Sequence, residues 1–345
     1  MLQRGKVPLW VRKRSTMNGL NNNARFGAIA VGRNEGERLK RCIASLSTAS
    51  VVVYVDSGST DGSAQWARKH GVEVVDLDMR LPFTAARARN AGFRRLREID
   101  PDLTYVQFLD GDCELVNGWT EYAIAFLIER PDVAVVCGRL RERHPERSVY
   151  NWLCDREWQV EPGEVQLCGG IAMVRVDAFE AVSGFREDLI AGEEPELCVR
   201  LRRIGWRIWR LDTEMALHDA AMMRFGQWWR RALRSGYAFA EGAYLHGSLP
   251  ERHWVWESGR AWLWGIILPV ACLMVGVILG PWGWVAWLIY PLQVLRQAVR
   301  NQGSPSQRTL VALFQVLARF PEACGQIKFI GDRLFGRQAQ LIEYK

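Results

Sequence analysis

An apolar segment that runs directly into a group of carboxylates constrains the fold of this chain most. Residues 106–109 (Val-Gln-Phe-Leu) have the character of a buried strand, and Asp110, Gly111 and Asp112 follow at once. Two carboxylates this close repel each other unless a cation lies between them, and glycine lets the backbone approach a ligand closely. Because oxygen ligands suit Mg²⁺ or Mn²⁺ held with substrate phosphates, the segment predicts a metal–diphosphate site at the edge of an α/β sheet.

Two other interpretations of this Asp-Gly-Asp segment are a polar turn and a calcium loop. The same residues are typical of a polar turn that binds nothing. A calcium loop starting at Asp110 is excluded, because Leu115 stands where that loop requires glycine. The sequence on either side of this segment is therefore needed to distinguish a polar turn from a ligand site.

Strands and helices alternate along the first half of the chain. Apolar runs predict strands at 26–31, 51–55 and 72–77, each followed by a polar loop and a helical segment. This order predicts an α/β fold with a mixed, mostly parallel central sheet flanked by helices, whose polar strand ends share one edge. Asp56, which follows the second strand, is the ligand candidate of its loop, whereas Asp61 is more simply explained as a helix cap.

The order of these segments resembles glycosyltransferase family 2, whose members use nucleotide-sugars and have a two-lobed, Rossmann-like GT-A fold. The resemblance covers residues 26–240 and rests on the segments 33–35, 56–63, 88–92, 110–112, 169–170 and 192–206. It implies an inverting enzyme that moves a sugar from a nucleoside diphosphate to an acceptor hydroxyl.

The resemblance also implies roles for single residues on the donor side. Asp56 would bind the nucleobase, Asp110 would face the ribose and the metal, and Asp112 would ligate the Mn²⁺ or Mg²⁺ that bridges the diphosphate. The remaining residues assigned to the nucleotide-sugar are Arg33, Asn34, Glu35, Arg89 and Asn90. UDP is the usual donor nucleotide of similar enzymes, so a UDP-sugar is the expected donor.

The acceptor side departs from the family at one position. Members commonly carry Glu-Asp before a helix with the pattern Leu-x-x-Arg, whereas this chain has Glu193 and Glu194. By position, Glu194 is the expected catalytic base that takes the proton from the attacking hydroxyl, and the longer side chain keeps Glu193 open as an alternative. The same acids would also stabilise the N-terminus of a helix, where the dipole favours negative charge.

Three later residues are further candidates for the site. His218 follows a short strand predicted at 208–211 and, by the resemblance, would ligate the metal or contact the phosphates; a structural histidine beside an acid is the alternative. Arg230 and Arg231 follow Gln-Trp-Trp, resemble part of a signature of processive polysaccharide synthases and are assigned to the diphosphate. The alternative is an interfacial aromatic–basic helix, and Arg231 replaces the signature's tryptophan, which weakens the case for processivity.

A long uncharged segment follows, because no Asp, Glu, Lys or Arg occurs at positions 261–295. This exceeds the length of about 20 residues that one span needs, and Gly-Pro-Trp-Gly at 280–283 indicates a turn. We therefore predict a helical hairpin, 262–279 and 284–295, with both ends in the cytoplasm because arginines flank it. A buried hairpin of a soluble domain is the alternative. An amphipathic helix at 310–320 would lie on the same membrane surface.

The chain is thus divided into a basic flexible tail (1–25), a catalytic domain (26–245), a membrane-associated or transmembrane hairpin (246–300) and an amphipathic C-terminal segment (301–345). The net charge of +7 is spread along the chain, which fits anionic lipid or phosphate-bearing substrates better than nucleic acid. The 8 cysteines form no Cys-x-x-Cys pair and are expected to be reduced thiols of a cytosolic compartment.

These features together predict an enzyme at the cytoplasmic face of the plasma membrane. Its acceptor would be lipid-linked or a saccharide, its product a cell-surface polysaccharide or glycolipid, and nucleic acid would not be a partner. Two other classes remain open: a non-catalytic membrane-bound module that binds nucleotide-sugars, and a nucleotidyltransferase. The latter usually carries a glycine- and lysine-rich loop after its first strand, which residues 32–35 do not resemble.

Overall fold

The computed structural model describes residues 25–337 and 339–343, so the predicted tail lies, apart from Arg25, outside the described residues. A nine-stranded sheet has the order β3-β2-β1-β4-β8-β6-β9-β5, with β7 beside β9. The strands are β1 (Phe26–Gly32), β2 (Val51–Asp56), β3 (Glu73–Asp76), β4 (Tyr105–Asp110), β5 (Cys113–Leu115), β6 (Val133–Glu142), β7 (Gly163–Val165), β8 (Ala172–Arg175) and β9 (Arg207–His218). The helices that flank the sheet are α1 (Glu37–Ser45), α2 (Ser63–Lys69), α3 (Ala85–Ile99), α4 (Trp119–Glu129), α5 (Val149–Glu157), α6 (Val176–Ala181) and α7 (Glu193–Arg203).

The N-terminal half of the sheet is parallel, as predicted. β1 pairs in parallel with both β2 and β4, and β2 pairs in parallel with β3. The register sets Gly32 beside Asp56 and Val31 beside Asp110. The polar ends of three strands therefore meet at one edge, because the carboxyl ends of parallel strands point the same way.

The other half of the sheet is mixed. β8 is antiparallel to β4 and β6, β6 is parallel to β9, and both β5 and β7 are antiparallel to β9. The α/β class with a mixed sheet is confirmed, although parallel and antiparallel pairings are equal in number among the described strands. The short strand predicted at 208–211 is wrong in length, because β5, β6 and β7 all pair along β9 and extend it to His218.

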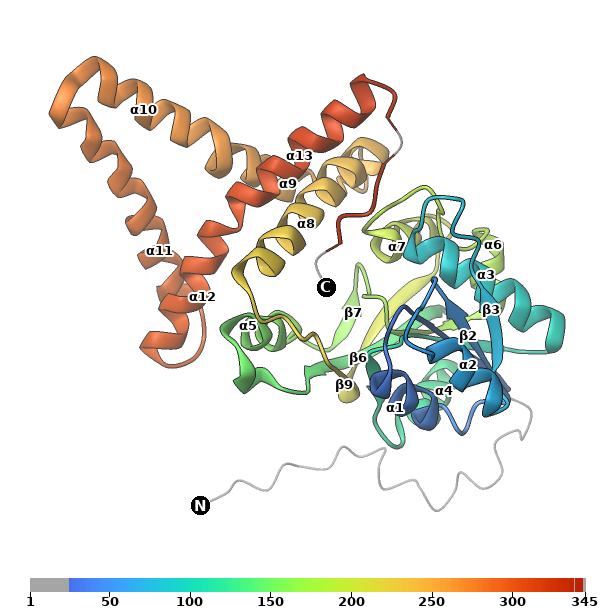
Figure 1. Cartoon of the computed structure of the whole chain (residues 1–345). Coiled ribbons are helices and arrows are strands. Elements are labelled where there is room, and N and C mark those ends of the chain that lie inside the picture. Colours follow the sequence, from blue (N-terminus) through green and yellow to red (C-terminus); the bar gives the residue numbers. More distant parts are fainter. Residues whose placement is uncertain (1–24, 338, 344–345) are drawn as a thin grey trace, which may run out of the picture.

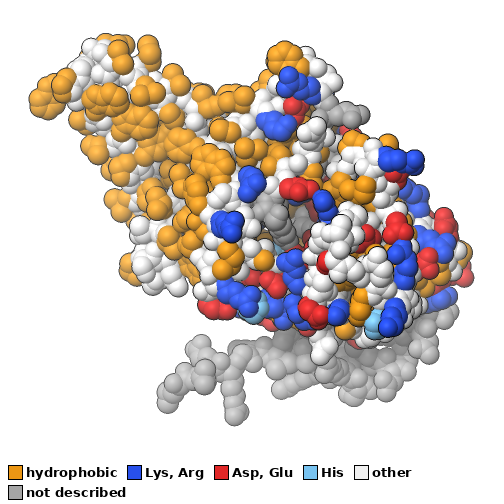
Figure 2. Space-filling view, in the orientation of Figure 1, with side chains coloured by type: hydrophobic (Ala, Val, Ile, Leu, Met, Phe, Trp, Pro, Cys, Tyr) orange, Lys and Arg blue, Asp and Glu red, His pale blue; other side chains and the backbone are white. Residues whose placement is uncertain are grey.

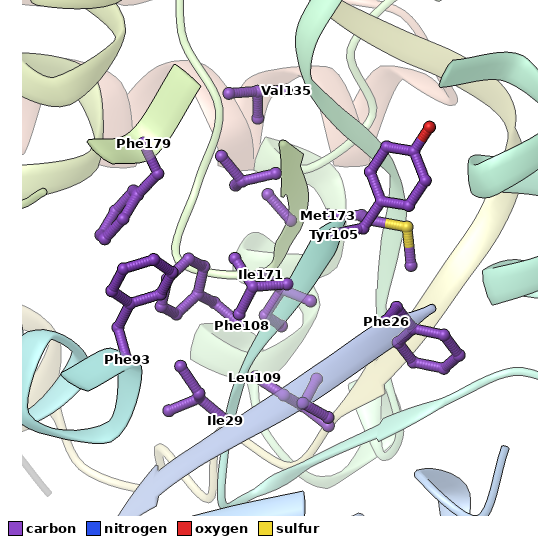
Figure 3. Close-up of a cluster of buried hydrophobic side chains, with 14 of the residues drawn as sticks. Phe26, Ile29, Phe93, Tyr105, Phe108, Leu109, Val135, Ile171, Met173 and Phe179 are labelled. Atoms are coloured by element: carbon purple, nitrogen blue, oxygen red, sulfur yellow. The ribbon is translucent and has the colours of Figure 1, made fainter. Parts of the chain in front are cut away.

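The hydrophobic core of residues 26–216 lies between the sheet and its helices (Figure 3). Phe108 of β4 lies 5.3 Å from Phe179 of α6, measured between ring centroids, and Phe93 of α3 lies 4.6 Å from the same ring. A fully buried phenylalanine stabilises the fold by about 1.5–3 kcal/mol. Helix α3 approaches the sheet closely at Gly92, where a Cβ atom would lie 2.6 Å from the side chain of Ile29. This close packing fixes where α3 presents Arg89.

The C-terminal third is helical and stands beside the sheet (Figure 1). Its helices are α8 (Phe225–His246), α9 (Val255–Trp262), α10 (Leu268–Leu279), α11 (Ile289–Arg300), α12 (Pro305–Leu317) and α13 (Arg319–Leu334). Helices α8 and α13 cross in contact at glycines. A Cβ atom on Gly236 would lie 2.0 Å from the carbonyl oxygen of Glu322, and one on Gly325 would lie 2.1 Å from that of Leu233. The C-terminal segment is thereby packed onto α8.

The uncharged segment forms the two arms that meet at the far tip in Figure 1. The first arm runs through α9 and α10, joined by a π-helical turn (Leu263–Ile267), and the second runs through a 3₁₀ segment (Gly280–Leu288) into α11. The chain reverses at Gly280, whose φ of +62° is a backbone conformation that glycine adopts without strain. By length and composition, Val255–Arg300 is apolar enough to cross a membrane. Figure 2 shows its hydrophobic side chains on the surface.

Helix α12 contains most of the amphipathic segment predicted at 310–320, and the helix breaks at Ala318 before α13 begins. Part of the predicted apolar face is covered by protein. The ring centroid of Phe314 lies 5.0 Å from that of Trp228 in α8 and 6.0 Å from that of Tyr150 in α5. Leu313 is exposed.

Candidate active site

The candidate site lies at the carboxyl ends of β1, β2 and β4. Asp110 is the last residue of β4, and Gly111 follows with its amide donating to the carbonyl oxygen of Val31 at 2.7 Å. A Cβ atom on Gly111 would lie 3.1 Å from the side chain of Glu35. Glycine at this position therefore lets the loops after β1 and β4 touch, whereas the sequence predicts that it lets the backbone approach a ligand.

Arg89 joins residues that the sequence had assigned to opposite sides of the reaction. Its guanidinium donates to Asp110 Oδ1 at 2.9 Å, Glu193 Oε1 at 2.9 Å and Glu194 Oε1 at 2.7 Å. Burial alone would lower the pKa of Arg89, but the three carboxylates raise it above its usual value, so the side chain is charged. The nucleotide-side acid and the two acceptor-side acids thus share one buried cation.

Gly170 explains why a glycine pair precedes this cluster. A Cβ atom on Gly170 would lie 2.4 Å from Arg89 Nη2 and 2.8 Å from Glu194 Oε1. Any side chain there would push the arginine away from the carboxylates. The glycine therefore provides room for the ion cluster.

Glu193 and Glu194 begin α7, where Gly192 adopts a φ of +79°. Burial, followed by repulsion from Glu193, raises the pKa of Glu194 to about 7. The side chain of Glu193 is 3% exposed and that of Glu194 is 15% exposed. Glu194 is the more accessible acid, and its pKa is that of a general base poised to work near neutral pH.

A second cluster forms where β5 and β9 pair. Cys113 and His218 are partners in the register, and His218 Nε2 lies 3.4 Å from Asp112 Oδ2. On the other side of the imidazole, Nδ1 lies 3.4 Å from Oε2 of Glu142, which is buried. Glu142 Oε2 also accepts from the amide of Ala220 at 3.1 Å, and the ring of Trp158 packs edge-on against His218. The imidazole is therefore oriented by the protein.

The residues around Asp112 are compatible with a divalent cation. Single ligand atoms of Asp112, Cys113 and His218 all lie within 4.8 Å of one another. A carboxylate oxygen and an imidazole nitrogen suit Mn²⁺, and water and phosphate oxygens commonly complete such a shell. The thiol of Cys113 instead donates to Asp112 Oδ1 at 3.4 Å. Asp110, the other predicted metal ligand, is bonded to Arg89.

Asp56 is built into its own loop. It accepts from the hydroxyl of Tyr54 at 2.9 Å and from the amides of Gly58 at 3.1 Å and Ser59 at 2.8 Å. Its side chain is buried, so these bonds shape the loop that follows β2. Asn34 joins the two loops at this edge, since its Oδ1 accepts from the amide of Thr60 at 2.7 Å.

The remaining predicted site residues lie in different places. Asn90 is turned to the loop after α6, where it bonds the backbone of Phe185 at 2.8 Å and 3.0 Å. Arg33 forms an ion pair with Glu343 at 3.1 Å. Arg231 lines a cavity of about 230 Å³ together with Asp110, Gly170 and His218, whereas Arg230 is exposed on α8 and is not among the residues of that wall.

Sequence reasoning missed Glu142 and Trp158, which orient His218. Both belong to segments without a recognisable motif. Glu142 is placed opposite His218 by the pairing of β6 with β9, and Trp158 lies at the end of α5, from where its ring packs against His218. The alternation of side chains along β6 predicts the face of the sheet on which Glu142 lies, but it does not indicate which residue of a neighbouring strand lies beside it. No signal in the sequence identified them.

The sequence is similar to that of a known family and of a curated protein. Residues 29–182 match the family model described as glycosyl transferase family 2. The succinoglycan biosynthesis protein ExoA of Rhizobium meliloti (strain 1021) is 28% identical over 212 residues, which cover 54% of this chain and 59% of that protein. The chain thus matches less than two thirds of the length of this curated relative.

Two solved structures were found to be similar, and one of them has a TM-score above 0.5. The mannosyltransferase PcManGT from Pyrobaculum calidifontis, solved in complex with GDP-Man and Mn²⁺, has a TM-score of 0.56 at 19% identity, and the match covers 90% of this chain and 88% of that one. The S. aureus protein TarS 1-349 has a TM-score of 0.45 at 16% identity, with 85% of this chain and 90% of that one covered. The likeness to the first of these supports the α/β class predicted from the sequence.

Proposed function

Residues 29–182 form a glycosyltransferase family 2 domain, and from this premise we propose that the chain transfers a sugar from a nucleoside-diphosphate sugar to an acceptor hydroxyl, with inversion at the anomeric carbon. The observation that carries the proposal is the contact of Arg89 with Asp110, Glu193 and Glu194. Asp110, an acid of the predicted donor side, and Glu194, the predicted base, thus contact the same arginine side chain.

On the donor side, Asp112 and His218 would hold Mn²⁺ or Mg²⁺. Such an ion neutralises the charge that develops on the departing diphosphate. Glu142 supports this role of His218, because a carboxylate that accepts from Nδ1 leaves the lone pair of Nε2 directed toward Asp112. Arg231, in the wall of the catalytic cavity, is the arginine that we assign to the diphosphate.

On the acceptor side, Glu194 would act as the base. Its carboxylate takes the hydroxyl proton while the acceptor oxygen forms a bond to the anomeric carbon, and the nucleoside diphosphate leaves with the electrons of the broken bond. A pKa of about 7 means that a large part of Glu194 is ionised at neutral pH and that it is still basic enough to accept the proton. Arg89 holds Glu194 in position through the bond of 2.7 Å.

The hydrophobic hairpin supports a membrane location at the cytoplasmic face. Its uncharged first arm, residues 261–279, would be about 28 Å long as a continuous helix, close to the thickness of about 30 Å of a bilayer core. All eight cysteines are free, and seven of them are buried, which is compatible with a reducing compartment. We infer an acceptor that is presented at the membrane, a lipid-linked saccharide, and a role in polysaccharide synthesis like that named for the ExoA relative.

Calorimetric titration of the detergent-purified protein with UDP, GDP and dTDP tests the donor site. With Mn²⁺ present, one of the three should bind, and EDTA or the variant Asp112→Ala should abolish that binding. Asp102→Ala, which removes an exposed acid before β4, is the matched control and should bind normally. Failure of all three diphosphates to bind to folded protein would reject the proposal.

The same preparation also tests for a module that binds but does not catalyse. Incubated with the nucleotide-sugar of the base selected by calorimetry, an enzyme slowly releases the nucleoside diphosphate to water even without its acceptor. A module that binds the diphosphate without any release would lack the transfer activity proposed here.

A further inference from the structure

A second, larger cavity lies beside the catalytic one. Its volume is about 900 Å³, at the upper end of the range typical of small-molecule sites. β6 and β9 form one wall, α5 another, and the end of α11 with α12 and α13 a third. Arg210 of β9 lines both cavities, so the two are neighbours. We call the larger space the α5–α12 cavity.

The charges in this cavity are unevenly compensated. Three of its acids have arginine partners: Glu157 with Arg231 at 2.8 Å, Glu214 with Arg141 at 2.8 Å, and Glu322 with Arg319 at 2.7 Å. Its two other acids, Glu161 and Asp212, are exposed.

Four arginines of the wall have no such compensation. None of them forms an ion pair with a carboxylate of residues 25–337 or 339–343; they are Arg139, Arg156, Arg210 and Arg300. The wall holds five arginines and five acids, but three of the acids are already paired, so these four arginines are balanced by only the two exposed acids. An anionic ligand would compensate the arginines that remain.

Arg139 is the least satisfied of the four. Its Nε is buried and has no hydrogen-bond partner among the described residues. A buried donor without a partner is costly, and a ligand oxygen that accepts from it removes that cost. Arginine presents its donors in a planar fork that matches the oxygens of a phosphate.

Apolar side chains also line the cavity, on the side of α8 and α12. They are Trp228, Val311 and Phe314. Arg300 ends α11, the arm that descends from the exposed hydrophobic tip (Figure 1). A ligand with an anionic group and a hydrocarbon chain would thus find arginines in the cavity and an apolar surface beside it.

We propose that the α5–α12 cavity binds the phosphate or diphosphate group of a lipid-linked acceptor, so that the attached saccharide extends past Arg210 into the catalytic cavity. The inference rests on the proposed function and adds to it the place and the chemistry of acceptor recognition. It also gives the hairpin a second role, since the membrane that holds it would present the lipid directly at this opening.

Binding of farnesyl diphosphate to the full-length protein in detergent micelles tests the assignment. The titrations contain EDTA, which prevents metal-dependent binding of the diphosphate near Asp112. Inorganic pyrophosphate and farnesol are titrated separately, to distinguish a soluble anion and a bare hydrocarbon from a lipid phosphate. The test variants are Arg139→Gln and Arg300→Gln, and the matched control is Arg80→Gln, an exposed arginine after β3.

Farnesyl diphosphate should bind at least tenfold more tightly than pyrophosphate, and each test variant should weaken its binding about tenfold. Arg80→Gln should leave it unchanged, and the affinity for farnesol should not respond to any of the three. Equal affinity for pyrophosphate and farnesyl diphosphate would overturn the lipid assignment. Unchanged affinity in both test variants would overturn the site itself.

The variant Asp112→Ala separates this inference from the function on which it rests. It should keep the affinity for farnesyl diphosphate and lose the metal-dependent binding of the nucleoside diphosphate. Protein that binds farnesyl diphosphate through Arg139 and Arg300, but binds no nucleoside diphosphate, would contradict the proposed donor site and leave the cavity assignment intact.

Discussion

The central strands and the hydrophobic hairpin are both apolar, but they bury their side chains to opposite extents. Ile29 of β1 and Leu109 of β4 are fully buried, whereas Val277 and Trp282 in the hairpin are 77% and 84% exposed. Helices of the same chain cover the strands, while much of the hairpin surface meets no other part of the described chain (Figure 2). An exposed apolar surface of this extent indicates a partner that is itself apolar.

The two regions also differ in charge. The edge at the carboxyl ends of β1, β2 and β4 gathers three carboxylates around the buried Arg89, while positions 261–295 carry no Asp, Glu, Lys or Arg. The ion cluster and the uncharged hairpin are thus separate parts of the chain. Substitutions in one region should change measurements that substitutions in the other leave unchanged.

Glu194→Gln should have the largest effect. Loss of a general base lowers kcat roughly 10²- to 10⁴-fold, while vesicle binding stays as in the wild type. In the wild type, kcat/KM should rise with pH through about 7, because the carboxyl with the raised pKa must lose its proton to act. Full activity in Glu194→Gln would remove Glu194 as the base, and Glu98→Gln, on an exposed part of α3, is the control.

Arg89→Met should lower stability most. It leaves Glu193, Glu194 and Asp110 without their shared cation, and breaking a buried ion cluster in this way costs about 3–5 kcal/mol of the free energy of unfolding. Denaturant unfolding measures the loss. Arg94→Met, an exposed arginine of the same helix, is the control and should change stability little. Equal stability of the two variants would mean that Arg89 does not hold the cluster together.

Val270→Arg should weaken attachment to the membrane without changing nucleotide affinity. Val270 is 53% exposed and lies at the middle of the uncharged first arm, residues 261–279. A charge near the centre of a bilayer costs about 2.5–3.5 kcal/mol per residue, so a smaller fraction of the protein should float with lipid vesicles. Ile128→Arg introduces the same charge at an exposed isoleucine of α4, outside the hairpin and the α5–α12 cavity, and should float like the wild type. Identical flotation of Val270→Arg and the wild type would contradict insertion of the hairpin.

Glu343→Gln should have the smallest effect. It releases Arg33, the residue that follows β1, from its ion pair with Glu343. The side chains of this pair are 50% and 61% exposed. Exposed pairs contribute little, so the affinity for the nucleoside diphosphate should change by no more than about fivefold. Calorimetry in low and high salt checks this, because screening should abolish even that difference. A larger change in the affinity for the nucleoside diphosphate that persists in high salt would contradict the weak contribution expected of an exposed ion pair.

The sequence predicts which polar residues meet at one edge of the sheet, because that prediction needs only each apolar strand and the residues directly after it. Parallel strands end on the same side of a sheet, so Asp56 and Asp110 could be brought together from their positions after two apolar runs. The hairpin could be predicted for the same reason, since an uncharged run with a central Gly-Pro needs no distant partner.

Side-chain contacts between segments far apart in the sequence could not be predicted in this way. The sequence assigned Arg89 to the nucleotide, but its bonds to Glu193 and Glu194 span more than 100 positions and depend on how α3 and α7 face each other. His218 was found, whereas Glu142 behind it was not. Adjacent residues of a helix point about 100° apart, so Arg230 and Arg231 leave α8 in different directions, and the sequence alone does not indicate that Arg231 is the one that lines the cavity.

The anomeric configuration of the released sugar tests the central claim most directly. With the nucleotide-sugar selected by calorimetry, proton NMR follows the first sugar formed when the wild-type protein transfers it slowly to water. A single displacement assisted by Glu194 predicts that this sugar has the anomeric configuration opposite to that of the donor. Initial release with the configuration of the donor would contradict the account, since it would require a different mechanism from the one assigned to these carboxylates.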